Sequence, residues 1–165
     1  MSWRRFFRHF FYRFRTIHSS FSKESLERIT QAITESEKEH DAELVFALES
    51  AISPLVALRG YSARERSIDV FSQLRVWDTE KNSGVLLYLL LADHDIEILV
   101  DRGINALTKP GDWEAICRAM EGNFREGKFE EGVKLGIFEI TKILKKYFPK
   151  TTGDKNEIPN RPVIL

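Results

Sequence analysis

Two groups of polar residues in this sequence carry side chains that could do chemistry. The first group comprises Asp78, Asn82 and Asp101. The alternative group comprises Glu49, Asp93 and Asp95. Carboxylate and amide oxygens are the ligands that calcium and magnesium prefer, whereas zinc would need histidine or cysteine. The sequence therefore predicts a calcium or magnesium site at one of these two groups.

Three predicted strands would bring these residues together. Segments 43–49 (ELVFALE) and 84–92 (GVLLYLLLA) are apolar at nearly every position, as strands buried on both faces are. A helix lies between them, so these strands should be parallel. The segment 95–101 alternates apolar and acidic residues, which is typical of a strand with one solvated face. We expect a two-residue turn at Asp93 and His94, which makes this third strand antiparallel to its predecessor.

This topology assigns the two groups to opposite edges of the sheet. Glu49, Asp93 and Asp95 fall at the carboxyl ends of the parallel strands, where ligands of open α/β sheets bind. The first group falls at the other edge. Two structural explanations remain open: an Asp101–Arg102 ion pair at a strand end, and a solvated turn at Asp93.

Amphipathic helices complete the predicted fold. Ser22 is placed to cap a helix that runs to about His40, and Ser62 opens another with a capping box to Glu65. The connection from 50 to 61 should be irregular, and Ile68, Phe71 and Leu74 should face the core. Two apolar stripes in 113–124 and 129–144 predict closing helices, and Gly132 and Gly136 predict close backbone packing between them. The pattern predicts an α/β protein, a three-layer α/β/α sandwich with a small mixed sheet and helices on both faces.

The first twenty residues form a basic aromatic segment with five arginines, seven aromatic residues and no acid. On a helical wheel two faces separate. The aromatic face carries Trp3, Phe6, Phe7, Phe10, Phe11 and Phe14. The basic face carries Arg4, Arg5, Arg8 and Arg15. Three uses remain open: docking of the aromatic face on the domain, attachment to an anionic membrane surface, and binding to RNA or a protein partner.

Composition limits the remaining possibilities. The 25 basic and 25 acidic residues cancel, which argues against nucleic acid as the general partner. A single cysteine, Cys117, excludes an internal disulfide and falls in an apolar helical stripe. No apolar run reaches the length of a membrane span, and no secretory signal is apparent, so we expect a cytoplasmic location, peripheral on the inner face of the membrane. We expect three parts: the basic aromatic segment 1–20, a domain over 21–149 and an extended tail over 150–165. The tail either docks on the domain, which we favour, or serves as a short recognition peptide.

The segments GVLLYLLLADHDIEILVDRGI and FREGKFEEGVKLGI, with a tryptophan-bearing helix between them, resemble the TPM domain family. The likeness is strongest to a short bacterial branch without signal peptide or membrane helix, in which WDTE precedes the long strand and the chain ends like NEIPNRPVIL. The resemblance implies an α/β/α sandwich, and relatives include an acid phosphatase and calcium-binding proteins. Asn82 and Gly84 match the family's residues before the long strand. The family's Asp-Arg turn falls on Asp93 and His94, which departs from the pattern at His94.

These observations favour a non-catalytic binding or accessory module near a membrane-associated assembly, with a divalent-cation site and an N-terminal segment that contacts a membrane or a protein. The alternative function, which the resemblance implies, is a metal-dependent, acid phosphatase-like hydrolase. In it Asp78, Asn82 and Asp101 hold the cation, and the candidate catalytic residue Arg102 steadies a phosphoryl oxygen. A third class, nucleic-acid binding through the basic aromatic segment, would require salt-dependent affinity.

Overall fold

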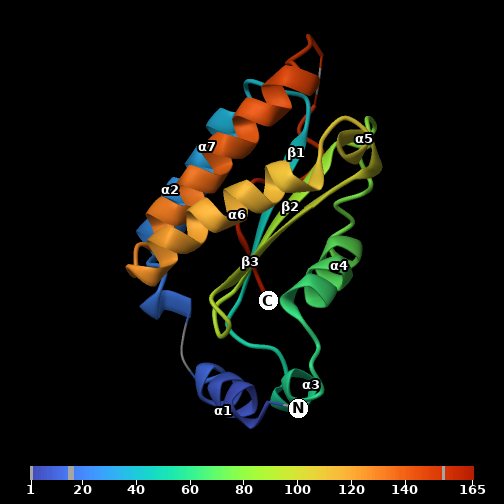
Figure 1. The fold of residues 1–165 in the computed structure, drawn as a ribbon. Helices are drawn as coiled ribbons and strands as arrows, with labels where there is room; N and C mark the ends of the chain where they lie inside the picture. The colour runs from blue at the N-terminus through green and yellow to red at the C-terminus, as the bar shows by residue number, and fades with distance from the viewer. Residues whose placement is uncertain (1, 15–16, 154) are drawn as a thin grey trace.

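The computed structural model describes residues 2–14, 17–153 and 155–165, which form an α/β/α sandwich (Figure 1). Its sheet has the strand order β3-β2-β1-β4. The strands are β1 (Glu43–Glu49), β2 (Gly84–Leu90), β3 (Asp95–Val100) and β4 (Val163–Ile164). β1 is parallel to β2, and β3 is antiparallel to β2, as the sequence predicts. The tail supplies β4, which pairs parallel with β1, so the expectation that it docks is confirmed.

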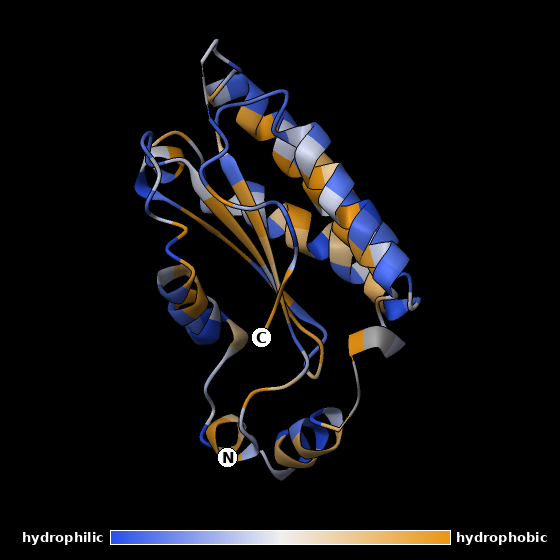
Figure 2. Ribbon diagram, turned by 180° about the vertical axis from the view of Figure 1, so that it is seen from behind, coloured by the Kyte–Doolittle hydropathy of each residue, from blue (hydrophilic) through white to orange (hydrophobic). Residues whose placement is uncertain are grey.

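Helices cover both faces of this sheet. One face packs against α2 (Lys23–Ser36), α6 (Pro110–Arg125) and α7 (Phe129–Tyr147), and the other against α4 (Ala63–Gln73). Every residue of β1 and β2 is buried, because both strands contribute side chains to a core on each side. Figure 2 shows these apolar strands between the helical layers.

Local sequence features explain where the helices begin and how they pack. The Ser22 hydroxyl accepts a hydrogen bond from Ser25 N at 3.1 Å, and Ser62 forms the predicted capping box with Glu65. A Cβ atom at Gly132 would come within 2.5 Å of the Phe124 ring, and one at Gly136 would clash with Met120. The close packing predicted at these two glycines is therefore confirmed, and the structure shows that the partner is α6.

Several local predictions are wrong. The connection after β1 contains a helix, α3 (Pro54–Leu58), because Pro54 is well suited to a first helical turn. Ile68 is exposed, since α4 buries the face that carries Ala63, Ser67 and Val70. Helix α2 ends at Ser36, before His40. The turn between β2 and β3 spans the four residues 91–94, because the register pairs Leu90 with Asp95.

The N-terminal segment forms α1 (Trp3–Tyr12), which lies beside α3 at one end of the molecule (Figure 1). A short 3-10 helix, Ile17–Ser19, follows it, and Arg15 of the predicted basic face lies outside the described residues. The remaining element, α5 (Arg102–Asn105), follows β3 at the opposite end of the sheet. The two ends of the sheet thus carry the two groups of polar residues.

Candidate functional site

The basic face of α1 is fixed to the domain through one carboxylate, that of Asp93. Arg5 donates two hydrogen bonds to Asp93 Oδ2, from Nη2 at 2.7 Å and from Nε at 3.0 Å. Arg8 pairs with Oδ1, and His9 Nε2 lies 3.2 Å from the same oxygen. Burial alone would raise the pKa of Asp93, but hydrogen bonds from His9 and Arg5 outweigh it and hold this pKa well below its usual range. Asp93 is therefore an anion held by three nitrogen-bearing side chains.

Further contacts orient α1 around this carboxylate. Arg5 Nη1 donates to the carbonyl oxygen of Ala57 in α3 at 3.3 Å, and the Tyr12 hydroxyl lies 3.1 Å from His94 Nε2. His9 is fully buried. Of the three uses left open for this segment, docking through the aromatic face is therefore wrong: a buried acceptor for arginine selects the basic face instead.

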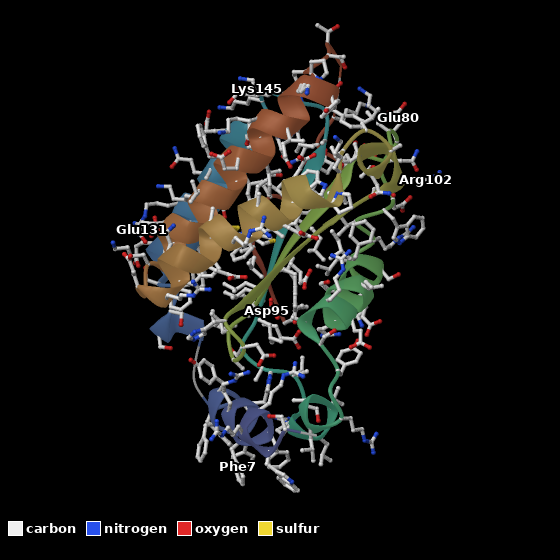
Figure 3. The ribbon with its side chains drawn as sticks, viewed as in Figure 1. Phe7, Glu80, Asp95, Arg102, Glu131 and Lys145 are labelled. Atoms are coloured by element: carbon white, nitrogen blue, oxygen red, sulfur yellow. The ribbon has the colours of Figure 1, made fainter. Side chains whose placement is uncertain are left out.

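The other side of α1 presents large aromatic side chains to solvent. We call Trp3, Phe7, Phe10, Phe11 and Phe14 the aromatic ridge. Their exposed fractions run from 44% for Phe10 to 74% for Phe14. Phe6 is half-buried, with its ring centroid 5.3 Å from that of Phe7. Figure 3 shows Phe7 on the outer side of α1, away from the sheet. An exposed cluster of this kind is typical of an interaction surface.

The alternative group of acids is dispersed among different partners. Glu49 accepts hydrogen bonds from the Tyr88 hydroxyl at 2.7 Å and from Arg66 Nε at 2.8 Å. The Asp93 carboxylate is bound by Arg5, Arg8 and His9 of α1. Asp95 is half-buried, and burial together with the charges of Glu97 and Asp93 raises its pKa to about 6. Among the described residues, no set of three or more histidine, cysteine or acidic side chains is arranged to hold a metal ion.

The first group is partly assembled at the other end of β3. Arg102 Nε donates to Asn82 Oδ1 at 2.7 Å, and Gly103 N donates to the Asn82 carbonyl oxygen at 3.0 Å. Asp101 Oδ1 accepts from Arg102 N at 2.7 Å, whereas its buried Oδ2 has no hydrogen-bond partner among the described residues. Asp78 pairs instead with Arg75 at 2.6 Å. The structure thus joins Asn82, Asp101 and Arg102, and gives Asp78 a different partner.

Sequence reasoning missed the cluster around Asp93. It considered Asp93 as a cation ligand and the arginines as membrane contacts, but did not pair them. The spacing of Arg5, Arg8 and His9, three and four residues apart, places them on one helical face and could have indicated an anionic partner. Nothing in the local sequence identifies which acid that partner is.

The fold and this arrangement define an α/β/α sandwich with a mixed sheet and an N-terminal helix clamped at the carboxyl edge of its parallel strands. The chain belongs to the TPM domain family, whose model matches residues 18–143. It is also similar to the NMR structure of the BA42 protein from the psychrophilic bacterium Bizionia argentinensis. That likeness has a TM-score of 0.80 and 29% sequence identity, and covers 91% of this chain and 99% of the other. A comparison with curated proteins gave no match. No helix in the described part of the chain is both long and apolar enough to cross a membrane.

Proposed function

We propose that this TPM domain protein is a non-catalytic binding module that attaches peripherally to a membrane surface through the aromatic ridge of α1. The observation that carries the proposal is the orientation of α1. Arg5, Arg8 and His9 hold the helix on the domain, which leaves the aromatic ridge facing outward. A helix of this kind is favoured at the level of the lipid headgroups. Its aromatic rings enter the apolar boundary of the bilayer, while its polar side stays in contact with water.

Charge next to the ridge supports an anionic lipid surface as the partner. Arg4 and Arg13 are exposed, and the Arg8 side chain is 47% exposed although it pairs with Asp93. Each cation near an anionic bilayer contributes about 1 kcal/mol. The attachment would therefore combine apolar insertion with a charge contribution that salt weakens.

Co-sedimentation with vesicles tests this attachment. We expect the protein to sediment with phosphatidylglycerol-containing vesicles and less with pure phosphatidylcholine. Salt should weaken binding to the phosphatidylglycerol-containing vesicles, where charge contributes. The double variant Phe7→Ser, Phe11→Ser should lose at least about tenfold in vesicle affinity, because two exposed rings no longer insert. Phe138→Ser is the matched control, since Phe138 is also an exposed aromatic residue but lies on α7. Equal loss in both variants, or none in either, would contradict the proposal.

We further propose that the group around Asp101 holds a divalent cation, which would also be required for the hydrolase alternative. The supporting observation is the buried Asp101 Oδ2, which lacks a hydrogen-bond donor. Asn82 and Asp78 would have to release Arg102 and Arg75 to join it. Titration with calcium and then magnesium, followed by backbone amide shifts, should give saturable changes around Asp101 that Asp101→Asn abolishes. No saturable shift at millimolar metal would argue against the site and the hydrolase alternative.

A further inference from the structure

A groove runs along the outer edge of the sheet, and β3 forms its floor. β3 is the last strand on this side of the described sheet. The groove has a volume of about 580 Å³ and is lined by all of β3, by Arg64 of α4 and by Trp113 and Cys117 of α6. In Figure 1 this edge faces the viewer, with α6 on one side of β3 and α4 on the other. The groove is therefore open along the length of a strand.

The backbone of β3 offers hydrogen-bonding groups to this groove. Arg64 Nη1 donates to the carbonyl oxygen of Ile98 at 3.3 Å, so this oxygen is directed away from β2. Alternate residues of an antiparallel strand direct their N–H and C=O groups to the same side, so Ile96 and Val100 direct theirs outward as well. A row that the sheet leaves unpaired in this way can pair with an added strand. The Arg64 side chain is 55% exposed, so it can move aside.

The groove is acidic. The acids that line it are Asp95, Glu97, Glu114 and Glu121. Three of them have cationic partners: Arg64 for Glu97, Arg118 for Glu114 and Arg125 for Glu121.

Asp95 differs from these three acids because it has no ion pair in the described part of the chain. It also borders a second hollow of about 400 Å³, which Asp93, His94, Glu121, Phe124 and Arg125 line with it. Arg125 is paired there with Glu121. A cation entering this hollow would reduce the repulsion between Asp95 and its acidic neighbours.

We propose that this groove binds an extended peptide segment that carries lysine or arginine, which adds to β3 as a strand and places a cationic side chain beside Asp95. Binding here is independent of membrane attachment, because no residue of the aromatic ridge lines the groove. A second copy of this chain pairing through its own β3 is disfavoured, since Asp95 and Glu97 of the two copies would repel each other.

A hexapeptide in which valine and lysine alternate is the probe for this proposal, with a valine–glutamate peptide as its matched control. Titrated into the full-length ¹⁵N-labelled protein, the lysine peptide should give saturable amide shifts at Ile96, Ile98 and Val100. Asp95→Asn should weaken its binding roughly fivefold. Equal binding of the two peptides, or shifts that spread over the molecule without a maximum on β3, would overturn the proposal.

Two arginine variants separate strand addition from simple charge attraction. Arg64→Ala and Arg118→Ala each remove one positive charge from the groove, but only Arg64→Ala also frees the Ile98 carbonyl oxygen. We expect Arg64→Ala to tighten binding of the lysine peptide more than Arg118→Ala does. Equal effects would mean that the peptide does not pair with the edge of β3, and would also overturn the proposal.

Discussion

At the scale of single residues, burial and hydrogen bonding set charge states that the sequence does not display. Glu37 follows α2, and its Oε1 accepts a hydrogen bond from Leu44 N at 2.9 Å. Burial raises the pKa of Glu37 to about 7, and the nearby Glu43 adds to this rise. His40 has the opposite behaviour, because burial lowers its pKa to about 4. It lies in a buried network in which its Nε2 is 2.9 Å from the Ser36 hydroxyl.

These two groups have opposing effects on stability as the pH changes. The Glu37 contribution is fully present below pH 4.5, its ordinary pKa, and is lost as the pH rises through 7. The His40 contribution is fully present above pH 6.5 and is lost as the pH falls towards 4, because the unfolded chain then binds a proton that the folded chain excludes. The windows overlap, so the two slopes offset each other in the wild-type protein.

The variant Glu37→Gln should reveal the contribution of Glu37 to the pH dependence of stability. It keeps an acceptor for Leu44 N and removes the charge, so we expect a gain of about 1–2 kcal/mol in the free energy of unfolding at pH 8.5. At pH 4.5 the gain should be within about 0.5 kcal/mol, because Glu37 is then protonated. Urea denaturation at both pH values measures the difference. Glu35→Gln is the control, since Glu35 is exposed on α2; a gain in Glu37→Gln that does not depend on pH would refute the assignment.

At the scale of elements, α1 illustrates how one long-range contact decides which face of an amphipathic helix is buried. Its two faces follow from the spacing of residues, and the sequence predicts them. The choice between them depends on Asp93, which lies more than eighty residues away in the chain. Arginine held by a buried carboxylate is fixed in direction, and this contact leaves the aromatic ridge exposed.

Asp93→Asn should release α1 while the sandwich stays folded. Arg5 and Arg8 would lose their anionic partner, and the buried His9 would lose the negatively charged carboxylate beside its Nε2. We expect amide hydrogen exchange in α1 to accelerate at least about tenfold, with β1 and β2 unchanged. Asp95→Asn is the matched control, because Asp95 lies two residues away and makes no hydrogen bond with α1. Because the pKa of Asp93 is lowered on folding, the stabilisation that this contact provides should be complete above pH 3.8 and decline as the pH falls below that value towards the lowered pKa of the folded state. Unchanged exchange in Asp93→Asn would show that other contacts hold the helix.

At the scale of the whole molecule, the sequence predicts those features that local patterns specify. The continuous apolar runs give β1 and β2, alternation gives β3, and the caps at Ser22 and Ser62 give helix starts. Features that depend on pairing in space are not predictable in this way. Asp78 pairs with Arg75 rather than joining Asp101. The Glu49 carboxylate accepts a hydrogen bond from the Tyr88 hydroxyl on the face of the sheet that α4 covers. Local spacing places these acids at the correct ends of the sheet, but it does not specify their partners.

The C-terminal tail closes the opposite edge of the sheet from the β3 groove. The buried Glu43 carboxylate accepts hydrogen bonds from the backbone nitrogens of Glu157 and Ile158, both at 3.1 Å. Beyond them β4 pairs with β1, and Leu165 N donates to Leu48 O at 3.0 Å. The tail therefore has two attachments: a clamp at the start of β1 and a short strand along it.

Two truncations should separate these attachments. Deleting residues 163–165 removes β4 alone and should cost about 1 kcal/mol of stability, because Val163 is only half-buried. Deleting residues 157–165 also removes the clamp and leaves Glu43 buried without its two backbone donors. We expect this deletion to cost about 3 kcal/mol in total. Both truncations should promote self-association, because both uncover the edge of β1. Urea denaturation measures the first effect and light scattering the second. If both truncations cost the same, the clamp contributes nothing, and β4 alone accounts for the docking of the tail.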